Sequence, residues 1–424
     1  ALALGSFVIL GLPDGMLGPA WPEMRQTFGA PIADLGLILL VSTGGSVAVS
    51  AFVGRLIRRI GVPALLGTAG ICAALGAAGF ALAPGLWLIL AVAVLVGVAA
   101  GMMDGGLNTA IGLAGRPRLL NLLHAAYGVG TTIGPLLITV AIVTGSWRPA
   151  YAVLSGLNLV MATLWLRQRR RERLRAAPSA SSPTSEDTDS PKTPTSTKNI
   201  PSPTSPTSIE VGDLHPSEGW SRRRSSAAVI AGMVLFFVYT GVEVGAGQWM
   251  ASYCRGYLGL SASGAGIATF GYWAAFTGAR IVLAVLPRQL ELTRIIRWGS
   301  VLGVVGAAAI WWQPDRAVAL AGFIVLAGGL SGVFPALIGL TPARIGHRRA
   351  EHVIAWQVGA AAAGGSGLSA FLGLLIGLFG LQILGPALTV GAVLLIAANY
   401  VLARVAPVAP GRAADRGWMT SSPR

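Results

Sequence analysis

The sequence predicts an all-α polytopic membrane protein in which twelve transmembrane helices form two six-helix bundles related by pseudo-symmetry. Composition is the first reason, because only 11% of the 424 residues are charged, against about 25% in a soluble domain, and 54% are hydrophobic. The second reason is that apolar segments long enough to cross ~30 Å of hydrocarbon recur along the chain. The third is a polar segment that separates six of these segments from six others.

Each predicted span is a long apolar run that contains small residues. Many of the 58 glycines fall inside these runs, as expected where helices pack closely without a hydrophobic driving force between them. The spans are expected near residues 1–20, 36–54, 63–83, 86–112, 119–144 and 148–166 in the first bundle, and near 227–254, 263–287, 293–313, 317–340, 350–377 and 381–403 in the second.

The composition changes abruptly between the sixth and seventh spans. In residues 178–208, 23 of the 31 residues are Ser, Thr or Pro. Such a segment cannot bury enough apolar surface to fold, so residues 168–226 are predicted to be a disordered cytoplasmic linker. It divides an N-terminal bundle (1–167) from a C-terminal bundle (227–404), which is followed by a cytoplasmic tail (405–424).

Positive charge is gathered on one side of the predicted membrane. The inner loops, the linker and the tail hold 26 of the 31 Lys and Arg residues. This asymmetry places both termini in the cytoplasm of a multi-pass cell-membrane protein. A nucleic-acid surface would not be divided among alternate loops, so no such partner is expected. The two cysteines make no metal spacing and no cofactor is expected, while the absence of an initial Met suggests a preceding segment.

The two halves share features at nearly constant offsets. GLPDG around Asp14 and GVEVG around Glu243 lie 229 residues apart, and the small-residue runs GVAAGMMDGG and LAGGLSGVFP are offset by about 228. Such offsets indicate a duplication, with two parallel repeats related by an axis along the membrane normal. The repeat position of Asp104 falls near the uncharged Gly332.

With these features, the chain resembles the major facilitator superfamily everywhere except in the linker. The superfamily's loop motif, Gly-x-x-x-Asp-Arg-x-Gly, is echoed between the second and third spans by Gly54, Arg58, Arg59 and Gly61. The resemblance implies that this loop takes part in gating. Arg58 stands where the family has Asp, so the acid of the family's charge latch is missing at that position.

Three further motifs narrow the resemblance to one branch. The fourth span contains DGGLN, the fifth contains HAAYG, and in the seventh a Glu is followed six residues later by a Trp. These stretches resemble the fucose–glucose–galactose:proton symporter group, which is fucose permease-like. In that group, carboxylates in helices one and four are associated with proton coupling and sugar recognition, which implies these roles for Asp14 and Asp104.

Three carboxylates, Asp14, Asp104 and Glu243, interrupt long apolar runs. A charge in mid-membrane costs roughly 2.5–3.5 kcal/mol even on lenient scales, so such residues usually serve a substrate pathway or a proton relay. Asp104 and Asn108 are one helical turn apart and give a polar stripe that suits sugar hydroxyls. The alternative for each is structural, as a polar contact between helices that contributes about 1 kcal/mol.

Several polar and aromatic residues are candidates for substrate binding. His124 also suits a proton relay, because its charge changes near neutral pH, and the alternative is a structural histidine. An interfacial position is the alternative for Trp249. Arg280 is expected to snorkel to the inner surface or to contact a loop, and the alternative is pairing with a carboxylate. The candidates for substrate binding are Asn108, His124, Tyr127, Glu243, Gln248, Trp249, Trp356 and Gln357, with Tyr272 and Trp273 as further residues that line the path.

The expected function is secondary active transport by alternating access, with proton-coupled uptake of a monosaccharide or a related small polar solute. The partners are then the solute, protons and the lipid bilayer, and the protein is expected to be a monomer. Two alternatives remain: an exporter of drugs or metabolites by proton antiport, and a non-transporting membrane sensor. Enzymatic activity is not expected, because no nucleophile–base set is recognisable in the sequence.

Overall fold

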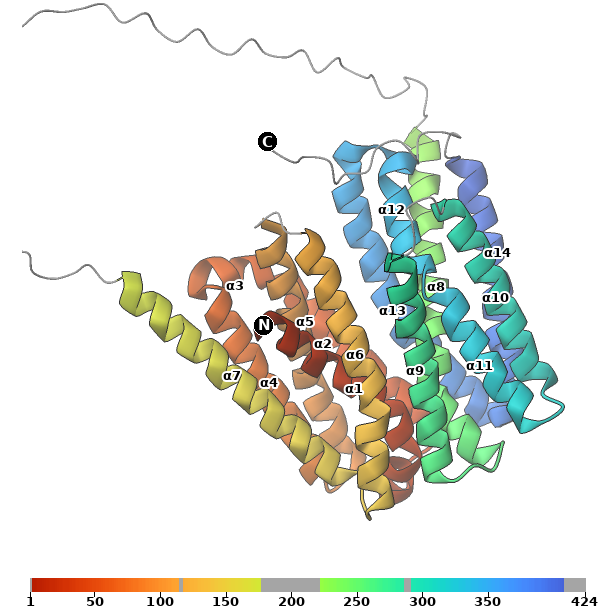
Figure 1. The fold of residues 1–424 in the computed structure, drawn as a ribbon, viewed down its shortest axis with the longest axis horizontal. Helices are drawn as coiled ribbons and strands as arrows, with labels where there is room; N and C mark the ends of the chain where they lie inside the picture. The colour runs from red at the N-terminus through yellow and green to blue at the C-terminus, as the bar shows by residue number, and fades with distance from the viewer. Residues whose placement is uncertain (1, 114–116, 177–221, 286–290, 408–424) are drawn as a thin grey trace, which may run out of the picture.

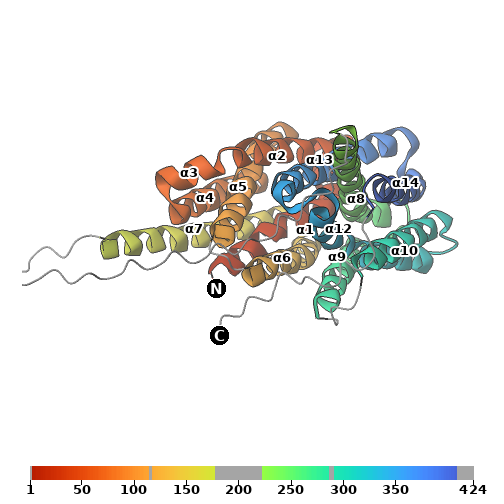
Figure 2. The same ribbon diagram turned by 90° about the horizontal axis from the view of Figure 1, so that it is seen from above.

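The computed structural model describes residues 2–113, 117–176, 222–285 and 291–407. Within these ranges nearly every residue is helical, and the helices form two bundles that lie side by side (Figures 1 and 2). Helix is the expected outcome in a bilayer, because a helix satisfies its backbone hydrogen bonds internally. The expected linker lies mostly outside the described residues.

The N-terminal bundle has six spanning segments, one of which is bent. α2 and α3 meet at 56° and form one span between them. α7 continues to Ala176, so the helix extends beyond the expected bundle boundary at residue 167. The helices are α1 (Leu2–Phe28), α2 (Asp34–Ser50), α3 (Val53–Ile60), α4 (Val62–Leu82), α5 (Leu86–Leu113), α6 (Pro117–Val143) and α7 (Arg148–Ala176).

The C-terminal bundle repeats this number of spans, and its fourth span is interrupted. α11 stops at Leu330 and α12 starts at Val333, so the break falls at Ser331 and Gly332, the repeat position of Asp104. The elements are α8 (Arg222–Gly256), α9 (Ala262–Val285), α10 (Leu292–Trp312), α11 (Arg316–Leu330), α12 (Val333–Ile345), α13 (His347–Phe379), the 3₁₀ turn η1 (Leu381–Ile383) and α14 (Leu384–Val405).

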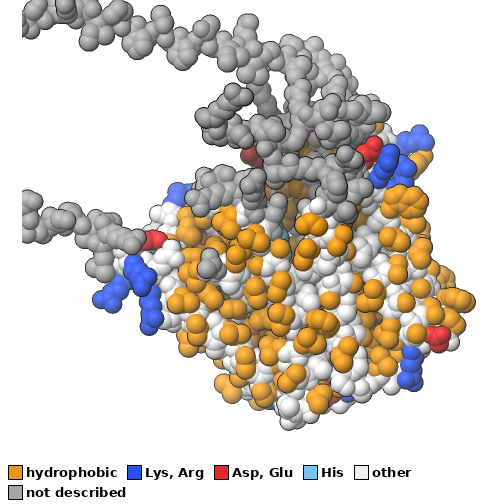
Figure 3. Space-filling view, in the orientation of Figure 1, with side chains coloured by type: hydrophobic (Ala, Val, Ile, Leu, Met, Phe, Trp, Pro, Cys, Tyr) orange, Lys and Arg blue, Asp and Glu red, His pale blue; other side chains and the backbone are white. Residues whose placement is uncertain are grey.

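The lengths and compositions of these helices fit a bilayer. Ten helical segments of the described chain are long and apolar enough to cross a membrane, or eleven if the bent α2–α3 pair counts as one span. α9 has 24 residues, so at 1.5 Å per residue it is about 36 Å long and also reaches across. Figure 3 shows one face of the molecule covered mainly by hydrophobic side chains, with charged ones near its two ends. The predicted fold class is therefore confirmed.

Close packing within each bundle depends on glycine. A Cβ on Gly97 of α5 would lie 1.8 Å from the carbonyl oxygen of Ser42 in α2, and one on Gly364 of α13 would lie 2.0 Å from that of Phe237 in α8. No other residue fits at these separations. The small residues of the spans therefore bring the helix backbones into contact, as expected where apolar burial does not hold helices together.

Among the described residues, the buried cores of the two bundles join toward one end of the molecule. Hereafter the linker end is the end of the molecule where α7 stops and α8 begins, and the far end is the opposite one. The buried core of the N-terminal bundle at the far end is continuous with the core of the C-terminal bundle. At the linker end, however, the N-terminal bundle has a separate core of its own around Phe7, Leu65 and Trp165. The halves accordingly diverge toward the linker end (Figure 1).

Candidate functional site

Asp14 lies in α1 at the point where the two halves begin to separate. α1 runs as one continuous helix through Pro13. The hydroxyl group of Tyr127 in α6 donates a hydrogen bond to the Asp14 carboxylate. The main-chain carbonyl of the same residue accepts one from Nε2 of Gln248 in α8, at 2.9 Å. Asp14 is nevertheless exposed, while residues 15–22 after it are buried. It therefore faces the opening between the halves.

Asp104 and Asn108 form the second polar pair of the N-terminal half. Nδ2 of Asn108 donates to Oδ1 of Asp104 at 2.9 Å along α5, as their spacing predicts. Asp104 is exposed and Asn108 is partly buried. His124 of α6 is also exposed and lies within electrostatic range of Asp104, with its ring edge-on to Phe7 at 6.1 Å between centroids. A carboxylate, an amide and an imidazole thus line the same opening.

Glu243 belongs to a cluster in the C-terminal half that includes two residues not predicted as site residues. The Tyr239 hydroxyl is within interaction range of both the Glu243 carboxylate and the Arg280 guanidinium. The same hydroxyl lies 2.9 Å from the carbonyl oxygen of Leu330, to which it donates. Tyr239 precedes Glu243 by one helical turn, and this spacing was the only sequence signal for its role.

The break between α11 and α12 exposes carbonyl groups that this cluster satisfies. Nε of Arg280 donates to the carbonyl of Ser331 at 2.9 Å, and its guanidinium lies 4.2 Å from the centroid of the Phe276 ring. Non-helical backbone at membrane depth is stable only where protein groups or a cavity satisfy it. Arg280 therefore does not use its side chain to snorkel to the surface; it contacts the turn between α11 and α12, and its charge lies near Glu243 inside the bundle.

The clusters of the two halves face each other. The Tyr127 hydroxyl is within electrostatic range of Asp14, Glu243 and Asp104, and His124 is within range of both Asp104 and Arg280. α1, α5 and α6 supply one side of this centre, and α8 and α9 supply the other. Residues up to 266 positions apart in sequence, Asp14 and Arg280, are thus brought to one polar region between the bundles.

Two predicted substrate contacts have other partners in this conformation. Trp249 is 0% exposed, and its indole Nε1 donates to the carbonyl of Ser369 at 2.9 Å, so it packs α8 against α13. Gln248 is 2% exposed and crosses between the halves to Asp14, as described above. Neither side chain reaches the opening. The physical reason is that both lie on the part of α8 that the other helices cover.

The remaining candidates for substrate binding also differ in whether they contact neighbouring helices. Gln357 is buried and accepts a hydrogen bond from Thr341 at 2.9 Å, which ties α13 to α12. Trp356 is exposed and takes part in none of the hydrogen bonds or ring contacts of the described residues. Tyr272 is buried and donates to the main-chain carbonyl of Glu243 at 2.7 Å, so it positions the backbone beside the cluster. Trp273 is buried between Tyr272 and Phe276.

The predicted gating loop is the short helix α3 followed by a glycine turn. Gly54, Arg58 and Arg59 lie in α3, and the two arginines are exposed. Gly61 has φ 79°, a left-handed conformation that favours glycine, and it ends α3 and starts α4. In the described part of the chain neither arginine has a carboxylate within ion-pair distance. The missing Asp of the motif thus leaves these two cations without an acidic partner among the residues that the structure describes.

Polar contacts and close backbone packing hold the halves together toward the far end. Arg255 of α8 forms a salt bridge with Glu23 of α1, and the hydroxyl oxygens of Thr132 in α6 and Thr277 in α9 lie 3.1 Å apart. Gly36 of α2 lies directly against Ala370 of α13. We call these contacts the seam. The Arg255–Glu23 and Gly36–Ala370 contacts lie in the halves of their helices away from the linker, and Thr132 and Thr277 lie near the middle of α6 and α9.

Fold and site together define a class of protein. Two six-helix halves that meet around a polar centre, with a broken helix beside it, form the architecture of a secondary transporter. Residues 3–370 match the family model described as Major Facilitator Superfamily, so the chain belongs to this superfamily of transporters. No curated protein matches the chain.

Solved transporters of the superfamily have a similar fold. A D-xylose-proton symporter has a TM-score of 0.70 at 13% identity, over 96% of this chain and 97% of that chain. The nucleoside transporter NupG has a TM-score of 0.68 at 11% identity, over 94% and 98%. The peptide transporter POT, solved in complex with sulfate, has a TM-score of 0.65 at 12% identity, over 96% and 94%. At these identities the likeness shows the fold alone.

Proposed function

We propose that the protein is a proton-coupled importer of a monosaccharide or a related small polar solute, and that it works by alternating access. The arrangement at Asp14 carries the proposal. This carboxylate lies in mid-helix, is exposed to the opening, accepts a hydrogen bond from Tyr127 of its own half and is joined through its backbone to Gln248 of the other half. A titratable group is therefore connected to both moving parts.

Proton coupling follows from the cost of enclosing a charge. Closing the halves over an ionised carboxylate removes it from water, whereas a protonated one is neutral and less costly to enclose. A proton on Asp14 or Asp104 therefore favours the occluded conformation and the conformation that follows it in the transport cycle. The charge asymmetry of the loops supports a cytoplasmic linker end, and the conformation described above would then be open to the cell interior.

The solute class is suggested by the groups around the opening. Asp104 and Asn108 offer acceptors and a donor on one face, and the rings of Tyr127 and His124 lie on the neighbouring helix. Hydroxylated solutes need such paired donors and acceptors. The resemblance of the fourth, fifth and seventh spans to the fucose permease-like branch supports a sugar.

One observation favours a second candidate, a proton antiporter that exports cationic compounds. Three acids, Asp14, Asp104 and Glu243, face one permanent cation, Arg280, which is already bound to Ser331. The centre therefore has a surplus of negative charge when its acids are ionised. A growth test separates the two functions: loss of the gene impairs use of a sugar in the first case and sensitises cells to lipophilic cations in the second. A purified protein that moves no solute in either direction would support a membrane sensor instead.

The coupling role of Asp14 is tested in proteoliposomes with the variant Asp14→Asn. A thermal-shift screen of monosaccharides on the purified protein first identifies a solute, because a specific binder stabilises the folded state. With this solute, Asp14→Asn is expected to abolish uptake driven by a proton gradient and to retain part of counterflow exchange. Glu291→Gln, which removes an exposed carboxylate at the linker end, is the control and is expected to transport normally. Unchanged uphill uptake by Asp14→Asn would refute the coupling role.

A further inference from the structure

The end of α7 carries a run of arginines beyond the part of the helix that packs in the bundle. Arg167, Arg170 and Arg171 are exposed, and Arg169 is partly buried. The last turns of α7 extend past α3 and α4 and away from the other helices (Figures 1 and 2). The end of α7 therefore carries positive charge at the level where the apolar surface of the bundle ends.

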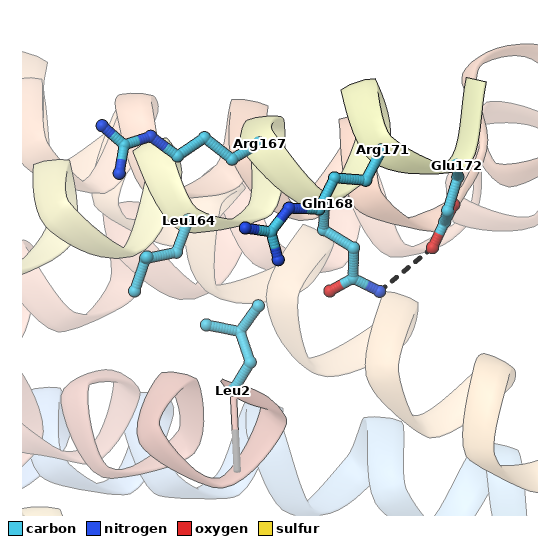
Figure 4. Close-up of a pocket in the computed structure, with 6 residues that line it drawn as sticks. All are labelled: Leu2, Leu164, Arg167, Gln168, Arg171 and Glu172. Carbon is cyan, nitrogen blue, oxygen red and sulfur yellow. Dashed lines mark hydrogen bonds between the residues drawn. The ribbon is translucent and has the colours of Figure 1, made fainter. Parts of the chain in front are cut away.

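A pocket of about 420 Å³ lies between this part of α7 and the start of α1. Figure 4 shows Arg171 reaching back over the pocket beside Gln168, while Leu2 of α1 faces it from the opposite side. The lining residues are Leu2, Leu164, Arg167, Gln168, Arg171 and Glu172. The pocket thus has an apolar side and a cationic side.

The cationic side has unused charge. Arg167 and Arg171 are one helical turn apart and lie on the same face of α7. Among the described residues, neither has a carboxylate within ion-pair distance. The nearby Glu172 carboxylate accepts a hydrogen bond from Nε2 of Gln168 at 3.0 Å. Two guanidinium groups and one carboxylate leave a net charge of +1, and a pair of guanidinium groups is well suited to a phosphate.

The apolar side continues along the helix into the membrane-facing surface. Val160 and Leu164 precede Gln168 at successive turns of α7, and their exposed fractions are 58% and 39%. One face of α7 therefore changes from exposed aliphatic side chains to arginines within about three turns. A phospholipid has the same order of chemistry, with acyl chains in the hydrocarbon and an anionic phosphate at its boundary. A free phosphate ion would use only the arginines.

We propose that this pocket binds the headgroup phosphate of an anionic phospholipid in the leaflet at the linker end, with its acyl chains along Val160 and Leu164. Basic pockets at the membrane boundary attract anionic lipids with about 1 kcal/mol per arginine or lysine, which is a factor of about five for each. The pocket is separate from the transport centre, so the proposal does not depend on which solute the protein transports.

The test measures lipid binding by native mass spectrometry of the delipidated full-length protein titrated with phosphatidylglycerol. The variant Arg167→Gln/Arg171→Gln is expected to bind roughly 10- to 30-fold more weakly than the wild type. Arg58→Gln/Arg59→Gln removes two of the three exposed arginines of α3 at the same end and is expected to leave tight binding unchanged. Phosphatidylcholine is expected to bind the wild type weakly and to be insensitive to either change.

Three outcomes would overturn the proposal. The first is equal loss of binding in both double variants, which would indicate a diffuse effect of surface charge. The second is displacement of phosphatidylglycerol by millimolar inorganic phosphate, which would mean that the pocket is a site for free anions. The third is undiminished binding by the α7 double variant. A single variant, Arg171→Gln, with an intermediate loss of affinity and an unchanged melting temperature, excludes misfolding as the cause.

Discussion

Substitution of Gly36 by alanine is predicted to open the seam at the far end. Gly36 of α2 and Ala370 of α13 belong to different halves, and a Cβ on Gly36 would lie 2.4 Å from the Cα of Ala370 and 2.8 Å from its Cβ. Non-bonded carbon atoms prefer about 3.5–4.0 Å, so the two helices have to separate by on the order of 1 Å. Only a conformation in which α2 and α13 touch at this point is affected.

The expected size follows from the cost of overpacking. One inserted methyl group in a tight contact costs about 1–3 kcal/mol, which shifts the equilibrium between the closed and opened far end by about 5- to 150-fold. Gly44→Ala is a matched control on the same helix, because a Cβ at Gly44 has no atom within 4 Å. Both substitutions raise helix propensity by about 1 kcal/mol, and this contribution cancels in the comparison.

The assay is double electron–electron resonance between spin labels at the far end of each half. Pro84 and Ala317 are exposed there and are changed to cysteine in a background that lacks Cys72 and Cys254. Gly36→Ala is expected to add a population at longer distance, with slower net transport, while Gly44→Ala keeps the wild-type distribution. If the two variants gave the same distances and transport rates at equal thermal stability, the contact between α2 and α13 would have no part in closure.

Two further predictions concern the charged groups of the seam and the centre. Glu23→Gln removes a salt bridge whose side chains are 25% and 29% exposed, so we expect it to destabilise the closed far end by less than about 1 kcal/mol. The effect should be visible with the same spin labels at low salt and should disappear at 1 M salt. An effect that does not depend on salt would contradict this prediction. Arg280→Gln leaves Glu243 without its cation and the Ser331 carbonyl without the Arg280 donor, so we expect a lower melting temperature. The double variant Arg280→Gln/Glu243→Gln should recover part of this loss, with a coupling energy between the two side chains of about 0.5–3 kcal/mol. Strictly additive losses would show that the two side chains act independently.

Much of the site could be located from sequence, because a carboxylate in an apolar run is rare and costly. Asp14, Asp104 and Glu243 were identified in this way, and the structure brings all three within electrostatic range of Tyr127. The spacing of Asp104 and Asn108 also predicted their hydrogen bond, since positions one turn apart face the same direction. Their roles in coupling and binding remain predictions.

The contacts of the other candidates could not be predicted from sequence. Gln248 and Trp249 are adjacent to each other in α8, yet one reaches Asp14 in the other half and the other reaches Ser369 in its own half. A helix that is apolar all round carries no periodic signal of which face meets which neighbour. The position of Arg280 depended in the same way on a helix break at Ser331, which small residues alone do not specify.

The amino-acid sequence by itself determined that the chain crosses a membrane many times, where its spans lie and which of them contain carboxylates, because these properties follow from the local cost of placing each residue in hydrocarbon. The tertiary structure alone decided which charges share a centre, which polar groups close the seam and which end is open. These properties depend on how helices far apart in sequence pack against each other, and that packing is set by close contacts such as Gly36 with Ala370, which no local pattern records.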